Sequence, residues 1–285
     1  MKIISASHRG MCFGVKEAVA RAMKLAAQQG KITILGDLVH NEAVHAALSA
    51  GSIHLRRNGE DILTATVMTS AHGASNKTLR KIQKNGHHVV EATCPLVRFV
   101  HRTLSQLVRD GYHPVIIGKS DHVEVRGMTE DLAEYDVVIS EQDVMQLKER
   151  PRFGVVSQTT QPVGRVQHLA AMIRSKFPRA EVLFKDTVCR PTKLRLSTAE
   201  EMAEKADAMV VVGSLHSNNT CELAAACRRH CGKVFQIQSP SQLQDDWFED
   251  THTVGVTAGT STPDEIIDAV ERQLAAWSNP IFTGP

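Results

Sequence analysis

Short apolar runs alternate along the chain with longer segments whose apolar residues recur every three or four positions. Residues 32–35 and 209–212 are typical of buried strands, whereas residues 15–29 have a helical period and stop at Gly30. Alternating strands and helices favour parallel pairing, in sheets covered by helices. The expected strands are 2–6, 32–35, 66–70, 88–92, 114–117, 137–140, 153–157, 181–184, 209–212, 234–237 and 253–257. The expected helices are 15–29, 42–49, 77–84, 96–109, 142–148, 163–176, 197–205, 221–230 and 263–277.

A cysteine follows a strand and precedes a helix in three places, at Cys12, Cys94 and Cys189. Pro95 suits the first position of a helix, and the positive end of the helix dipole stabilises a thiolate at the residue before it. A lone cysteine in such a place is usually a buried structural residue. Three of them, 82 and 95 residues apart, instead indicate three repeats that account for the 285 residues.

The repeats also agree in their internal order. His40, His122 and Ser217 each lie 28 residues after one of these cysteines and just after a strand. Ligands bind at the carboxyl ends of strands in open α/β sheets, so we expect the thiolates to converge on one metal centre ringed by polar residues. A third strand end follows in each repeat, at residues 69–72, 157–159 and 257–261.

This pattern predicts an α/β fold of three pseudo-symmetric αβα lobes with parallel-type sheets. The lobes are expected at residues 13–95, 96–188 and 189–277, with residues 1–12 completing the third sheet and residues 278–285 forming a tail. Low-complexity linkers are absent from the sequence, so we expect the lobes to pack closely.

Composition argues against several classes of protein. The net charge is +2 and aromatic residues make up 4% of the chain, so we expect no nucleic-acid partner. No apolar run reaches 18 residues and the N-terminus lacks the apolar core of a signal peptide, so we expect neither a membrane span nor export. Six cysteines without an export signal predict a cytoplasmic protein, in which cysteines bind metals or catalyse reactions.

The spacing of the three cysteines limits the kind of metal site. Zinc fingers need close pairs of ligands, which these cysteines do not form. Thiolates from three lobes suit one 4Fe–4S cluster per chain, with one iron left without a protein ligand. Cys221, Cys227 and Cys231 are weaker candidates, because the last two share a helix face and such cysteines are usually packed.

The polar ring around this centre suits an anion, since helix N-termini supply N–H groups and positive partial charge. Each member alone is explained as an ordinary helix cap, but histidine at two equivalent repeat positions is harder to explain in that way. Glu124 lies beside the ring, and a closed cavity would raise its pKa so that it donates a proton; the alternative is an exposed loop acid. The ring consists of His40, His72, His122, Ser217, Asn219 and Ser261.

Nine motifs combine these residues in one order. They are Arg9-Gly10-x-Cys12-x-Gly14-Val15, His40-Asn41, Ser70-Ala71-His72-Gly73, Ala92-Thr93-Cys94-Pro95-Leu96-Val97, His122-x-Glu124-Val125, Gln158-Thr159-Thr160, Asp186-Thr187-x-Cys189, Val212-Gly213-Ser214-x-x-Ser217-x-Asn219 and Thr257-Ala258-Gly259-x-Ser261. As a set they resemble the 4-hydroxy-3-methylbut-2-enyl diphosphate reductase (LytB/IspH) family over nearly the whole chain.

The resemblance implies three lobes arranged as a trefoil around a 4Fe–4S cluster held by Cys12, Cys94 and Cys189. It implies reductive removal of the substrate hydroxyl, which gives isopentenyl and dimethylallyl diphosphate in the last step of the methylerythritol phosphate pathway. Glu124 with Thr159 would deliver protons, assisted by His122, and a ferredoxin or flavodoxin would supply two electrons. The implied substrate-binding residues are His40, His72, His122, Thr159, Ser217, Asn218, Asn219 and Ser261.

The sequence departs from the family pattern at several positions. Val123 stands where Pro is usual, Arg126 where Glu is usual, and Asn218 where Ser is usual; Asp121 and residues 190–196 also differ. Two alternatives to the reductase stay open, and the differences bear on the first of them. One is a diverged paralogue that reduces a related allylic diphosphate or phosphonate, and the other is a non-catalytic metal-binding protein.

Overall fold

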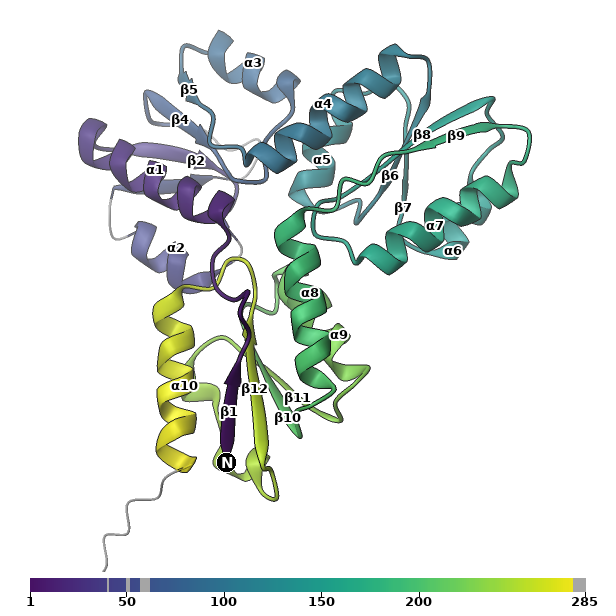
Figure 1. Ribbon diagram of the computed structural model, residues 1–285. Coiled ribbons are helices and arrows are strands. Elements are labelled where there is room, and N and C mark those ends of the chain that lie inside the picture. Colours follow the sequence, from purple (N-terminus) through teal and green to yellow (C-terminus); the bar gives the residue numbers. More distant parts are fainter. Residues whose placement is uncertain (40, 50–51, 57–61, 279–285) are drawn as a thin grey trace, which may run out of the picture. The chain divides into compact units, whose positions relative to one another are not determined.

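The computed structural model of the chain describes residues 1–39, 41–49, 52–56 and 62–278, and these form an α/β fold with three parallel sheets of four strands each (Figure 1). The predicted fold class is confirmed in this respect. Two compact units divide the chain between them. The first comprises Met1–Cys12, His40–Val44 and Arg190–Pro285, and the second comprises Phe13–Val39 and His45–Cys189.

The sheet of the first unit has the strand order β1-β12-β10-β11. The N-terminal strand therefore pairs in parallel with the last strand of the chain, from Lys2 opposite Thr253 to Ser5 opposite Val256. The strands are β1 (Lys2–Ser5), β10 (Ala208–Val212), β11 (Lys233–Ile237) and β12 (Thr253–Ala258), and the helices are α8 (Arg190–Ala203), α9 (Asn218–Arg228) and α10 (Asp264–Ser278), with short 3₁₀ turns at Pro240–Gln242 and Asp245–Phe248.

The central strand β10 is buried on both faces. Successive side chains of a strand point to opposite faces, so Val210 and Val212 pack in the cluster that includes α10, whereas Met209 and Val211 pack with α8 and α9. All five residues of β10 are buried, which explains why this strand is a continuous apolar run in the sequence.

The second unit contains the other two sheets, with strand orders β3-β2-β4-β5 and β7-β6-β8-β9. Their strands are β2 (Ile32–Leu35), β3 (Ile53–Arg56), β4 (Thr66–Thr69), β5 (His88–Val90), β6 (His113–Ile117), β7 (Asp136–Val138), β8 (Arg152–Ser157) and β9 (Glu181–Phe184). The helices are α1 (Phe13–Gln29), α3 (Asn76–Lys84), α4 (Pro95–Arg109), α5 (Val123–Thr129), α6 (Glu141–Gln146) and α7 (Val163–Lys176), while α2 (Glu42–Ser49) has residues in both units.

Two acidic residues that follow α5 bind the N-terminus of α3 within this unit. The carboxylate of Asp131 accepts hydrogen bonds from the backbone N–H groups of Asn76 (2.7 Å) and Lys77 (2.9 Å), and Glu130 accepts one from the hydroxyl of Ser75 (2.6 Å). Carboxylates are favoured at this position, because the first N–H groups of a helix have no partner within it. The contact holds the helix of one sheet against the loop of the next.

Several element boundaries differ from the sequence prediction. Helix α8 begins at Arg190 instead of near residue 197, since Pro191 in its first turn is compatible with a helix, and α9 begins at Asn218 instead of at residue 221. Helix α5 was not among the predicted helices, because its N-cap is His122, which is not among the residue types typical of that position. Strand β3 was not predicted either. The proposed lobe boundaries stay a prediction, and part of the expected tail lies outside the described residues.

Within the described ranges, no helix combines the length and apolar character needed to cross a membrane.

Candidate functional site

The three cysteines of the repeat occupy equivalent places in the structure. Cys12, Cys94 and Cys189 each lie directly before a helix, are partly buried, and form no disulfide. The backbone N–H of each cysteine donates to a carbonyl in a loop that follows a strand. Cys12 donates to Thr260 (3.1 Å), Cys94 to Ala71 (3.0 Å) and Cys189 to Thr159 (3.0 Å).

The loops that accept these bonds also share a turn. The N–H of Gly73 donates to the carbonyl of Ser70, and the corresponding turns run from Gln161 to Gln158 and from Thr262 to Gly259. Each turn holds one predicted substrate-binding residue: His72, Thr159 or Ser261. The repeat predicted from cysteine spacing is therefore present in the backbone hydrogen bonds, with a cysteine tied to each loop.

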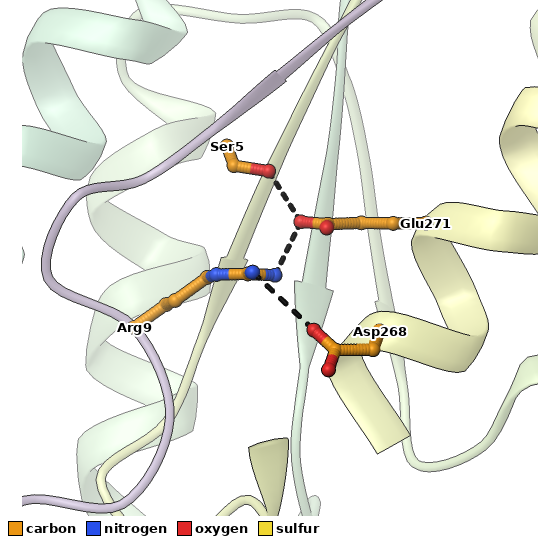
Figure 2. Close-up of polar contacts among 4 residues, drawn as sticks. All are labelled: Ser5, Arg9, Asp268 and Glu271. Carbon is orange, nitrogen blue, oxygen red and sulfur yellow. Dashed lines mark hydrogen bonds and ion pairs between the residues drawn. The ribbon is translucent and has the colours of Figure 1, made fainter. Parts of the chain in front are cut away.

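Side chains from distant parts of the first unit hold the loop that leads to Cys12. Figure 2 shows Arg9 bound to Glu271 and Asp268 of α10, with Ser5 also donating to Glu271; the Arg9–Asp268 distance is 3.3 Å. The pairs are partly exposed, so their contribution to stability is small, but together they orient the chain three residues before the cysteine.

A buried arginine joins this loop to the loop that carries Ser261. Arg195 of α8 is 4% exposed, and its guanidinium donates to the carbonyl of Gly10 (2.8 Å) and to that of Ala258 (2.5 Å). Sequence reasoning missed this residue, because the start of α8 was placed too late. Gly10 has a φ of +73°, and a Cβ there would lie 2.0 Å from a carboxylate oxygen of Asp264, so the loop needs glycine at this position.

Gly14 allows the first turn of α1 to approach Cys94 in the second unit. A Cβ at position 14 would lie 2.5 Å from the sulfur of Cys94 and 3.2 Å from its Cβ. The stretch that follows Cys12 in sequence thus packs directly on the second cysteine. The glycine in the motif around Cys12 is explained by this contact.

The three cysteines are of the residue type that holds iron–sulfur clusters. None of the three cysteines forms a disulfide, and cysteine thiolates are the usual ligands of such clusters. Cys12 belongs to the first unit, and Cys94 and Cys189 to the second. Over the part of the chain that the structure describes, no group of three or more His, Cys, Asp or Glu side chains is placed to hold a metal ion.

Glu124 is buried in the second unit, with 1% of its surface exposed, and is therefore not an exposed loop acid. Its two carboxylate oxygens accept hydrogen bonds from Thr159, one from the backbone N–H (2.7 Å) and one from the hydroxyl (2.8 Å). Burial raises the pKa of Glu124 to about 7, although the two bonds from Thr159 favour the charged form and act in the opposite direction. Near neutral pH this carboxyl can both give and accept a proton.

Two histidines lie close to one another in the same unit. The rings of His72 and His122 meet edge to face, with their centroids 5.6 Å apart. His122 is the N-cap of α5, and its Nδ1 accepts a hydrogen bond from the N–H of Glu124 (3.2 Å), so a neutral His122 carries its proton on Nε2. The structure therefore places the ring of His72 against that of His122, which precedes Glu124 by two residues.

The remaining predicted ring residues belong to the first unit. Ser217 is the N-cap of α9 and accepts a bond from Thr220 N–H (3.4 Å), while the side-chain oxygen of Asn219 accepts one from Thr260 N–H (2.9 Å). Asn218 and Ser261 are buried, at 6% and 5% exposure. Ser217 thus caps a helix just as His122 does. His40 lies outside the described residues.

These features define a parallel α/β protein whose cysteines and buried acid follow the carboxyl ends of strands, the edge at which open α/β sheets bind ligands. The family model "LytB protein" matches residues 3–275. The chain belongs to the LytB family.

Curated relatives match the chain along nearly all of its length. The 4-hydroxy-3-methylbut-2-enyl diphosphate reductase of Syntrophotalea carbinolica is 36% identical over 280 residues, which cover 98% of this chain and 100% of the relative. The protein of the same name from Geobacter metallireducens is 33% identical over 275 residues, covering 96% and 97% of the two chains.

Solved structures show the same fold. The E-1-hydroxy-2-methyl-but-2-enyl-4-diphosphate reductase from Plasmodium falciparum has a TM-score of 0.91 at 24% identity, covering 99% of this chain and 89% of its own. A second structure, described as (E)-4-hydroxy-3-methyl-but-2-enyl diphosphate reductase, the terminal enzyme of the non-mevalonate pathway, has a TM-score of 0.71 at 31% identity and covers 96% and 99% of the two chains. The predicted family resemblance is confirmed.

Proposed function

We propose that the chain is a 4-hydroxy-3-methylbut-2-enyl diphosphate reductase that forms isopentenyl and dimethylallyl diphosphate. The observation that carries the proposal is the identity, over 98% of the chain, to a curated relative with that activity in its name. The buried acid, the paired histidines and the repeated cysteine loops give that activity a physical basis in this chain.

The reaction removes a hydroxyl group from an allylic diphosphate. The carbon–oxygen bond breaks, two electrons and two protons enter, and the products are water and a carbon–hydrogen bond. One proton converts the departing hydroxyl to water and the other completes the allylic carbon. The electrons come from a reduced carrier protein of the ferredoxin or flavodoxin type.

Cys12, Cys94 and Cys189 would hold a 4Fe–4S cluster, which supplies one-electron transfers when it is bound. The chain's own contribution is to present three thiolates at helix N-termini. The three backbone bonds from the cysteines to Thr260, Ala71 and Thr159 orient these thiolates and tie each of them to a substrate-binding loop.

Glu124 delivers protons to the substrate. Burial raises its pKa to about 7, so the protonated form is available near neutral pH. Thr159 holds both oxygens of the carboxylate and so fixes the direction of transfer. His122 precedes Glu124 by two residues and assists by orienting the first turn of α5 through the bond from Glu124 N–H.

The diphosphate is held by neutral donors and helix N-termini instead of by a cluster of lysines or arginines. Ser217 and Asn218 stand at the N-terminus of α9, whose free N–H groups favour an anion. The proposed set is His40, His72, Ser217, Asn218, Asn219 and Ser261.

The proposal is tested with protein reconstituted anaerobically with iron and sulfide. Reduced methyl viologen should drive consumption of 4-hydroxy-3-methylbut-2-enyl diphosphate, and the two C5 diphosphates should appear in the product mixture. Protein with about four irons per chain that turns over a related allylic diphosphate or phosphonate, but not this substrate, would contradict the proposal in favour of a diverged paralogue. Stoichiometric zinc without iron would point to a non-catalytic metal-binding protein.

Cysteine variants test the ligand set separately from turnover. Replacing Cys12, Cys94 or Cys189 by Ser should each abolish the charge-transfer absorption of the cluster. Cys227→Ser is the matched control, because Cys227 is fully buried in the α9 cluster, where burial raises the pKa of its thiol to about 12 and disfavours the thiolate that metals bind. Loss of the cluster in the control, or its retention in a ligand variant, would refute the assignment.

A further inference from the structure

The first two turns of α4 present an exposed stripe beside Cys94. Pro95, Arg98, Phe99 and Arg102 are exposed and recur at the spacing of one helix face. The opposite face is buried through Val97, Val100, Leu104 and Leu107. Phe99 keeps 50% of its surface exposed, although burying a side chain of its kind stabilises a fold by about 1.5–3 kcal/mol.

A second exposed phenylalanine lies one residue before Gly14, which packs against Cys94. Phe13, the first residue of α1, is 51% exposed and directly follows Cys12 in sequence. Its neighbour Gly14 packs against the sulfur of Cys94, so the first turn of α1 lies against the residue that precedes α4. We call Phe13, Arg98, Phe99 and Arg102 the aromatic–arginine face.

The charge of this face comes from its two arginines. On α1 the next exposed residues, Lys16 and Glu17, are opposite in sign and balance each other. Arg98 donates to the backbone carbonyl of Thr93 (3.2 Å), which keeps its charge near Cys94. Phenylalanine and arginine are both enriched at protein–protein interfaces, where lysine and the acids are depleted.

We propose that the aromatic–arginine face receives the electron donor, a small acidic carrier protein. This inference rests on the proposed function, which requires two electrons per turnover. Each encounter would oxidise the donor by one electron, so two encounters supply one reaction. The face adjoins Cys94 and follows Cys12, and a donor seated on it therefore approaches two of the proposed cluster ligands. Its small size suits a transient redox complex, and its positive charge steers an acidic partner.

A second basic surface, on α3, is an alternative binding site for an acidic partner and provides the comparison. Helix α3 carries Arg80, Lys81 and Lys84 along an open groove of about 470 Å³ that also includes Lys77 and Asp131. None of the residues that line this groove is aromatic. If charge alone attracted the acidic partner, it would bind α3 as readily as α4. Helix α3 is therefore the appropriate comparison.

The experiment compares charge reversal on the two helices in the iron-loaded protein. The variants are Arg98→Glu with Arg102→Glu on α4, and Lys81→Glu with Lys84→Glu on α3. The probe is a reduced plant-type ferredoxin, an acidic one-electron carrier. Two quantities are measured without substrate: the dissociation constant by calorimetry with oxidised ferredoxin, and the rate of cluster reduction by stopped flow.

At low salt the α4 variant should bind ferredoxin about 10-fold more weakly than the parent protein, and its cluster should be reduced about 10-fold more slowly. Both differences should shrink at high salt, because screening increases. The α3 variant should match the parent protein. Phe99→Ser should weaken binding at every salt concentration, with Met145→Ser, another exposed apolar residue, as its control. Reduction by dithionite should be equal in all of these proteins.

Two results would overturn the inference: unchanged ferredoxin binding in the α4 variant, or a loss confined to the α3 variant. Failure of the proposed function has a different signature. In that case the parent protein would not convert the diphosphate even with reduced methyl viologen, whatever the ferredoxin binding shows.

Discussion

Glu124 and Cys189, which are 65 residues apart in sequence, are joined through a single residue, Thr159. The N–H and hydroxyl of Thr159 donate to the two oxygens of Glu124, and its carbonyl accepts the N–H of Cys189. The proposed proton donor and one proposed cluster ligand are thus held by the same residue. A change at Thr159 therefore acts on both.

Replacing Glu124 with Gln should lower turnover by about 10²–10⁴-fold, because the amide keeps the size of the carboxyl but cannot donate a proton to the substrate. Cluster content should stay at the parent level, since Gln can still accept the N–H of Thr159. Turnover and iron content are measured on the same preparation. Glu134→Gln, at a side chain 68% exposed, is the control. Parallel losses of iron and turnover would mean that Glu124 is structural.

The rate should fall as the pH rises through about 7, because Glu124 must begin the reaction protonated and its pKa is raised to about 7. Removing the hydroxyl at position 159 takes away a bond that favours the charged form, so Thr159→Val should move this inflection to higher pH. Thr159→Ser keeps the hydroxyl and should leave it in place. The measurement is kcat/KM against pH for the three proteins. If the inflection occurs at the same pH in Thr159→Val as in the parent, the titration belongs to another group.

The stability of the protein should also depend on Glu124. Its folded pKa of about 7 lies above the ordinary value of 4.5, so between these values the folded state binds more protons than the unfolded state. The free energy of unfolding therefore falls as the pH rises from 4.5 to 7, by roughly 3 kcal/mol from this group. Denaturant titrations at pH 5 and pH 8 should show a smaller difference in Glu124→Gln than in the parent. An equal difference would exclude Glu124 as the source.

Gly14→Ala should reduce iron binding and cost about 1–3 kcal/mol of stability, because the new Cβ would lie 2.5 Å from the sulfur of Cys94. Gly164→Ala is a close control: Gly164 is also the second residue of a helix, and a Cβ there would meet nothing within 4 Å. The control should be neutral or slightly stabilising, since alanine favours a helix. Iron per chain and thermal midpoint are compared, and equal behaviour of the two variants would remove the steric argument.

Arg195→Met should destabilise the first unit by about 2–4 kcal/mol, because two buried carbonyls, those of Gly10 and Ala258, lose their donors. It should also lower cluster occupancy by loosening the loop before Cys12. Arg229→Met removes an exposed pair with Glu200 and should change the free energy of unfolding by less than about 1 kcal/mol. A loss of stability with full cluster occupancy would show that Arg195 stabilises the fold but does not position Cys12 for cluster binding.

Much of the architecture could be predicted from the sequence by itself. Continuous apolar runs identified strands such as β10, because a strand buried on both faces has no polar alternation. The repeat of Cys12, Cys94 and Cys189 identified the loops at the strand ends, and the same spacing placed His122 and Ser217 in equivalent cap positions. These features are local or periodic, so they leave a record in the order of residues.

Only the tertiary structure revealed what surrounds the local features. Glu124 could be an exposed loop acid or a buried proton donor from its sequence alone, and its burial beside Thr159 decides between them, since pKa depends on solvent and on partners distant in sequence. The bonds from Arg195 to Gly10 and Ala258, and the contact of Gly14 with Cys94, likewise bridge segments that are 63 to 185 residues apart. Contacts of this kind depend on how sheets and helices pack, and no short pattern in the sequence records that packing.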